Sequence, residues 1–214
     1  MNQTIAASRV AVKLAFQYAW HHVGDTQQQS KLSVALARID SVNAADPRGY
    51  ELEYARRLSA WVERLCPSAS EPLQLAARAQ HIGRWLSPRE SYPPGRSGYL
   101  KWRTDLKQLH AQKTGEILHE VGCDDPTVTR VQDLIQKRNF PRDPEACVLE
   151  DALCLLFLET QFTTTTAKTG AEKMVVILQK TWQKMTPQAH QLALTLPLPA
   201  DCLALVKRAL QESK

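Results

Sequence analysis

Hydrophobic positions recur at helical spacing along most of the chain, and no segment alternates hydrophobic and polar residues as a half-buried strand would. Residues 27–45 and 50–66 are two such segments, and Pro47 and Pro67 mark where they end. The other predicted helices are residues 70–86, 99–121, 125–137, 146–158, 168–185, 186–194 and 200–211. The pattern predicts an all-α fold, a single helical bundle.

The most hydrophobic of these segments, residues 146–158, contains two adjacent carboxylates, Glu150 and Asp151. Burying a carboxylate costs several kcal/mol unless a cation, a metal ion or strong hydrogen-bond donors meet it. Another part of the chain is therefore expected to supply such partners. The alternative is that one carboxylate faces solvent at the rim of the helix while the other pairs with an arginine.

Two histidines lie on hydrophobic faces of other predicted helices, and Glu51 lies near the hydrophobic edge of a third. Imidazole nitrogen and carboxylate oxygen together suit Zn, Mn or Fe, and helical bundles hold such ions between facing helices. The predicted ligands of a divalent metal ion are His81, His110, Asp151 and Glu150. Glu150 or Glu51 is predicted as the fourth ligand or as the general base. The alternative is that both histidines are core residues hydrogen-bonded to the carboxylates without a metal.

Arginine and aromatic residues interleave around residues 87–98, the one long segment rich in proline and glycine. Guanidinium groups bind phosphate in a bidentate way, and neighbouring tyrosine or tryptophan rings can stack on a base. The alternative is a solvated basic loop whose aromatic residues anchor it to the domain. The predicted substrate-binding residues are Arg84, Arg89, Tyr92, Arg96, Tyr99, Trp102 and Arg103.

A length of 214 residues suits one domain with a real core, predicted here as residues 29–214 with an N-terminal extension over residues 1–28. The net charge of +5 favours anionic partners, a small phosphate-bearing substrate or RNA. Five widely spaced cysteines predict free thiols in a reducing compartment, and no apolar run is long enough for a membrane span. The expected location is the cytoplasm. Residues 1–24 contain no Asp or Glu, which is also typical of a mitochondrial presequence.

Six short motifs resemble domain-of-unknown-function family 4202, and the resemblance extends from about residue 31 to residue 210. The motifs are Glu51–Arg57, Ala77–Trp85, Pro88–Pro93, Gly98–Arg103, Leu109–Ala111 and Leu149–Ala152. Some members of that family are labelled glutamyl-tRNA synthetase-like. That activity needs a nucleotide-binding domain built on a parallel sheet, which no segment of this chain predicts.

More distantly, the helix order is similar to the HD-domain superfamily of metal-dependent phosphohydrolases and di-iron oxygenases. That resemblance implies a metal held by a histidine of the first helix, a His-Asp pair and a late aspartate. Gln80-His81 stands in the place of the pair, Asp151 in the place of the late aspartate, and His110 matches an additional histidine of some members. Glu51 or Tyr54 stands where the first histidine would be.

These observations predict a divalent-metal-dependent enzyme on an HD-like helical domain. Metal-bound water would attack a phosphoester or a related small anionic or nucleotide substrate held by the arginines. Two alternatives stay open: a di-iron oxygenase, and a non-catalytic module that binds a nucleotide or RNA through the basic loop. The sequence does not determine the oligomeric state.

Overall fold

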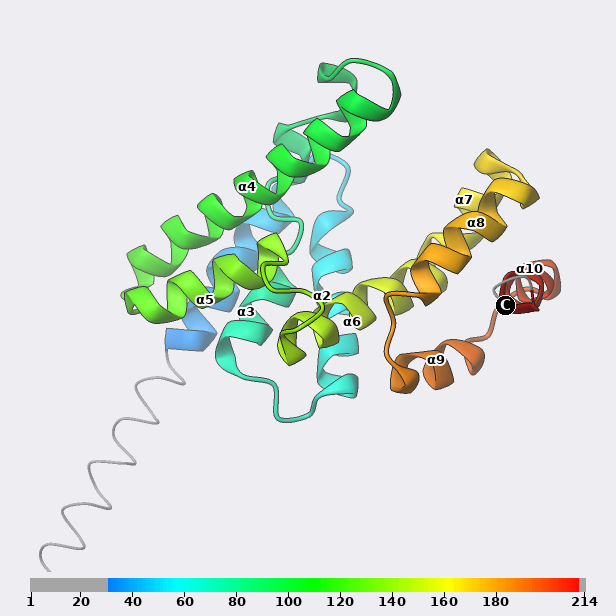
Figure 1. Ribbon diagram of the computed structural model, residues 1–214. Coiled ribbons are helices and arrows are strands. Elements are labelled where there is room, and N and C mark those ends of the chain that lie inside the picture. Colours follow the sequence, from blue (N-terminus) through cyan, green and yellow to red (C-terminus); the bar gives the residue numbers. More distant parts are fainter. Residues whose placement is uncertain (1–30, 212–214) are drawn as a thin grey trace, which may run out of the picture.

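The computed structural model describes residues 31–211, and every regular element within that range is a helix (Figure 1). The first helix is described over residues 31–44. The others are α2 (Glu51–Leu65), α3 (Glu71–Ala79), α4 (Gly95–Val121), α5 (Asp125–Gln136), α6 (Pro144–Thr160), α7 (Phe162–Thr169), α8 (Ala171–Trp182), α9 (Pro187–Leu194) and α10 (Ala200–Gln211), with single turns of 3₁₀ helix at η1 (Arg84–Leu86) and η2 (Arg89–Ser91). The all-α prediction is confirmed. The predicted N-terminal extension, residues 1–28, lies outside the described residues.

Four helices begin in the same way, with a polar side chain at the N-cap and a proline in the first turn. The N-cap residues of α3, α5, α6 and α9 are Ser70, Asp124, Asp143 and Thr186, and each accepts a hydrogen bond from a backbone N–H of the first turn. Such a cap satisfies one of the N–H groups that a helix start leaves free, and the ring of proline removes another. These local signals fix where each helix starts.

Helix α6 belongs to two groups of helices. It packs on α2, α3 and α5 on one side and on α7 and α9 on the other, where α10 packs on α8 (Figure 1). Its side chains Leu149, Leu155 and Leu156 are almost completely buried. Full burial of such a side chain stabilises the fold by about 1.5–3 kcal/mol. The helix that carries Glu150 and Asp151 is thus held from both sides.

The predicted helix over residues 70–86 is two elements instead of one. Helix α3 ends at Ala79, and Gly83 has a left-handed backbone with φ of 68° before η1 begins. A Cβ atom at Gly83 would also lie 2.8 Å from Cδ of Lys113. Because of this turn, the side chains of His81 and Arg84 do not lie on the surface of a regular α-helix.

The loop predicted over residues 87–98 is shorter, because α4 begins at Gly95. Pro93 folds back against the first turn of α4, and a Cβ atom at Gly98 would lie 1.9 Å from the carbonyl oxygen of Pro93. Only glycine leaves room for that approach.

All five cysteines are free, as predicted. Within the part described, no helix combines the length and the apolar character needed to cross a bilayer.

Candidate anion-binding site

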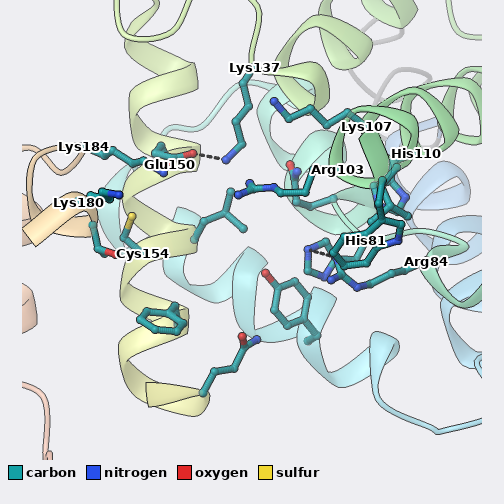
Figure 2. A pocket seen from close by; sticks show the side chains of 18 of the residues that line it. His81, Arg84, Arg103, Lys107, His110, Lys137, Glu150, Cys154, Lys180 and Lys184 are labelled. Carbon is teal, nitrogen blue, oxygen red and sulfur yellow. Dashed lines mark hydrogen bonds and ion pairs between the residues drawn. The ribbon is translucent and has the colours of Figure 1, made fainter. Parts of the chain in front are cut away.

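A cavity of about 600 Å³ lies between α4 and the end of α5 on one side and α6 and α8 on the other (Figure 2). Its walls include aromatic and aliphatic side chains, among them Tyr54, Tyr99, Trp102 and Phe157. The basic side chains that line it are Arg84, Arg103, Lys107, Lys137, Lys180 and Lys184. Among the described residues, the one carboxylate that lines it is Glu150, so this part of the lining carries a formal excess of five positive charges.

Glu150 is 5% exposed and is met by two lysines from different parts of the chain. Its Oε2 accepts a hydrogen bond from Lys137, and its Oε1 lies 3.2 Å from Nζ of Lys184. Burial by itself would raise the pKa of Glu150, but Lys137 and Lys184 outweigh it and hold that pKa below its usual value. Glu150 is therefore ionised at neutral pH, and the partners of this buried carboxylate are lysines.

Lys137 reaches Glu150 from an unusual backbone position. It is the C-cap of α5, with φ of 60° and ψ of 35°, the left-handed region that residues with a Cβ seldom adopt. Its own N–H bonds to the carbonyl of Leu134. The turn directs the lysine side chain across to α6, where Figure 2 shows its bond to Glu150.

Asp151 points away from this cavity, because successive side chains on a helix project about 100° apart. Its carboxylate accepts hydrogen bonds from the backbone N–H of Thr186, at 2.8 Å, and from the Thr186 hydroxyl. Burial raises its pKa, and these two bonds oppose the shift. The structure thus does not bring Asp151 together with His81 and His110. Asp151 fixes the residue that caps α9.

His81 packs flat on Tyr54, with ring centroids 4.2 Å apart and an interplanar angle of 9°. Its Nδ1 lies 3.5 Å from Oε2 of Glu51, and its Nε2 lies 3.4 Å from Nη1 of Arg84. Burial, and then the positive charge of Arg84, places its pKa well below the ordinary value. His81 is therefore a neutral imidazole at physiological pH.

His110 is 3% exposed, which confirms its predicted inward position. Its Nδ1 lies 2.7 Å from the carbonyl oxygen of Ile82, so Nδ1 carries the proton and Nε2 carries a lone pair. That Nε2 is buried and has no hydrogen-bond partner within the described residues. Burial, reinforced by His81 at 5.9 Å between ring centroids, lowers the pKa of His110 to about 3.

Glu51 completes this buried group from the first turn of α2. It is 1% exposed; its Oε1 lies 3.2 Å from Arg48, and its Oε2 has no hydrogen-bond partner within the described residues. Burial raises its pKa. His81 thus lies against both Glu51 and His110, whereas Asp151 and Glu150, the predicted carboxylate ligands, have Thr186 and two lysines as their partners. Over residues 31–211, however, no group of three or more His, Cys, Asp and Glu side chains is placed to hold a metal ion.

The predicted substrate-binding residues divide into two sets. Arg84, Tyr99, Trp102 and Arg103 line the cavity, with the guanidinium of Arg84 stacked 5.0 Å above the ring of Trp102. The indole N–H of Trp102 donates a hydrogen bond to the carbonyl oxygen of Ser87. This bond fixes the position of the ring on which Arg84 stacks. These residues sit at the η1 end of the cavity.

Arg89, Tyr92 and Arg96 do not line the cavity. Arg89 donates to the carbonyl oxygens of Tyr92 and Pro93, both at 3.0 Å, and so holds the turn before α4. The Tyr92 hydroxyl donates to Asp105 at 3.0 Å, and the side chain of Arg96 is exposed. The structure gives Arg89 and Tyr92 a role in shaping this segment.

Sequence reasoning missed Lys107, Lys137, Lys180 and Lys184. The spacing of four residues places Arg103 and Lys107 on one face of α4, and the same spacing separates Lys180 from Lys184, which lies just beyond the end of α8. That pattern is a weak signal, because most lysines lie on solvated surfaces. Cys154 also lines the cavity, but burial raises the pKa of its thiol to about 12, so it is not a thiolate at neutral pH.

The all-helical fold and the basic cavity do not identify a protein family by themselves. Comparison with known families does. The family model described as Domain of unknown function (DUF4202) matches residues 33–206. The match covers most of the chain, and the protein belongs to this family, as its motifs predicted. No curated protein and no solved structure matches the chain.

Proposed function

We propose that this protein binds a small phosphate-bearing molecule in the cavity between α4, α6 and α8. The observation that carries this proposal is the unbalanced charge of the lining. Lys137 and Lys184 share the single carboxylate of Glu150. Within the described residues, the remaining basic side chains of the lining form no ion pair with a carboxylate; they are Arg84, Arg103, Lys107 and Lys180.

These cations repel one another, and Lys107 shows the effect. Burial lowers its pKa, and the neighbouring charges of Lys137 and Arg103 lower it further. An anion bound among these cations would offset their repulsion and raise the pKa of Lys107 back toward its ordinary value. Ammonium and guanidinium groups together are the side chains that proteins use for phosphate.

The size and the walls of the cavity also fit a small molecule. Ligand pockets occupy roughly 300–1,000 Å³, and the volume here is about 600 Å³. The rings of Tyr99, Trp102 and Phe157 offer flat apolar surfaces beside the cations. A phosphate group with an attached ring or carbon skeleton would use both kinds of wall.

Binding of inorganic phosphate tests the proposal. A ligand that binds only the folded state raises the melting temperature. Sodium phosphate is expected to raise the melting temperature above that in sodium chloride of equal ionic strength, and Lys107→Gln is expected to reduce the increase. Lys173→Gln, an exposed position on α8 outside the cavity, is the matched control. Equal melting temperatures in the two salts would refute the proposal.

A second candidate is metal-dependent phosphoester hydrolysis at the same cavity, and the geometry of His110 favours it. Histidines that bind metals usually donate their other ring N–H to a carbonyl or carboxylate, as Nδ1 of His110 does to Ile82. Two neutral imidazoles and the carboxylate of Glu51 have the donor chemistry for Zn, Mn or Fe, although their present placement does not form a complete ligand set. When bound, such an ion would supply a Lewis acid and a water of lowered pKa.

Elemental analysis of protein purified without chelator separates these candidates. Near-stoichiometric metal that disappears in His110→Ala supports the enzyme, and iron with an absorbing oxidised form would favour the di-iron oxygenase over the hydrolase. Absence of metal from the wild type, even after reconstitution, would refute both enzymes and leave a binding module.

A further inference from the structure

The basic side chains come from separate walls of the cavity. Arg103 and Lys107 are four residues apart on α4, which corresponds to a separation of about 6 Å along the helix axis. Lys180 lies on α8, and Lys184 lies two residues beyond the end of that helix at Trp182. Figure 2 shows Lys107, Lys137 and Arg103 on one side of the Glu150 carboxylate and Lys180 and Lys184 on the other.

Resting on the proposed function, we infer that the ligand is a small molecule with two or more linked phosphate groups. A single phosphate monoester carries about 1.5–2 negative charges at neutral pH. The lining has five more positive than negative charges, spread over walls that face each other. One phosphate group balances less than half of that excess, and a diphosphate or triphosphate balances most of it.

Glu150 does not substitute for these phosphates. Its carboxylate is buried, and within the described residues its ion pairs are with Lys137 and Lys184. Arg103 and Lys107 on α4, and Lys180 on α8, form no ion pair with a carboxylate of the described residues. The ligand is therefore expected to contact both walls at once, Lys107 on one and Lys180 on the other.

The position of the cations favours a small ligand over an RNA strand. They line a cavity of about 600 Å³, whereas a strand would need an open basic track along the surface. Arg89, in the segment before α4, does not extend such a track into the cavity, because its guanidinium is occupied by backbone carbonyl oxygens. RNA binding is the outcome to be excluded.

The test is calorimetric titration of the metal-free full chain with inorganic phosphate, pyrophosphate and tripolyphosphate at one fixed ionic strength. Affinity is expected to rise at least about tenfold from phosphate to tripolyphosphate, since each added charge-assisted contact is worth about a factor of ten. Lys107→Gln and Lys180→Gln, one from each wall, are each expected to weaken tripolyphosphate about tenfold. Lys173→Gln is expected to leave all three affinities unchanged. Circular dichroism confirms that each variant folds.

The outcomes separate this inference from the proposed function. Equal affinity for all three anions, or loss of tripolyphosphate binding in Lys173→Gln as well, would overturn the inference and leave a simple phosphate site. No binding of any of the three would overturn the proposed function itself. Tight binding of a short single-stranded RNA that survives both Lys107→Gln and Lys180→Gln would overturn both.

Discussion

Replacement of Glu150 by glutamine is expected to destabilise the protein and to strengthen anion binding. The side chain keeps its size and loses its charge, so the packing of α6 is preserved. Lys137 and Lys184 then lack their carboxylate, with 20% and 46% of their side chains exposed. Both lysines become available to a ligand in the cavity.

The structure bounds the size of both effects. Removing one partner of a fully buried ion pair costs about 3–5 kcal/mol. Because solvent reaches both lysines and screens their charges, we expect a loss of about 1–3 kcal/mol in the free energy of unfolding. The affinity for tripolyphosphate is expected to rise about tenfold, because the anion no longer competes with a fixed carboxylate.

Urea denaturation with and without tripolyphosphate measures both quantities. The pH dependence gives a further check, because the pKa of Glu150 is lower in the folded state than its ordinary value of 4.5. Its ionisation therefore stabilises the fold above pH 4.5, and this contribution is lost as the pH falls through the folded-state pKa. The stability difference between wild type and Glu150→Gln should accordingly shrink below about pH 4.5.

Two results would refute this reasoning. A variant with weaker tripolyphosphate binding would mean that Glu150 assists the ligand, as the general base or metal ligand of the original prediction would. A variant of unchanged stability would mean that the lysines gain nothing from the buried carboxylate. Lys101→Gln, which breaks an exposed ion pair with Asp105 on α4, provides a control of small effect.

Three other measurements check separate parts of the structure. Asp151→Asn is expected to lower the free energy of unfolding by about 1–3 kcal/mol, because Thr186 loses a charged hydrogen-bond acceptor. The same substitution is expected to leave the affinity for phosphate unchanged. An altered affinity would contradict a purely structural role of Asp151. NMR titration of His110 should show a neutral ring from pH 8 down to pH 5. Since its folded-state pKa is about 3 against 6.5, stability should fall as the pH drops below 6.5, and His110→Gln should weaken this fall while the contribution of His81 remains. Gly98→Ala is expected to lower the free energy of unfolding by about 1–3 kcal/mol, because its Cβ would overlap the carbonyl oxygen of Pro93. Gly122→Ala is the control, since Gly122 has open space around it and the substitution loses only the preference of glycine for a positive φ. Equal melting temperatures of Gly98→Ala and the wild type would contradict the close approach.

Local signals made much of the fold predictable. The caps at Ser70, Asp124 and Thr186 are adjacent in sequence to the helices they start, and the inward position of His110 follows from the hydrophobic stripe of its own helix. The break at Gly83 was missed, because a glycine inside a helical pattern is compatible with both a helix and a turn.

The site was only partly predictable, since its partners come from distant segments. Burial of Glu150 and Asp151 was expected, and both are buried. Which partner each would meet depends on how α6 is rotated, and that rotation is set by packing against α2 and α9. Lys137, which donates a hydrogen bond to Glu150, is positioned by a left-handed backbone turn. No local sequence motif predicts that turn.

The position of α6 between two groups of helices that share one hydrophobic core has a thermodynamic consequence. Neither group of helices can separate from the other without exposing Leu155 and Leu156, so the described part of the chain should unfold as one cooperative unit. A ligand in the cavity would contact α4 from one group and α8 from the other. Free energy gained at that contact would therefore also stabilise helices that do not line the cavity, including α10, which packs on α8.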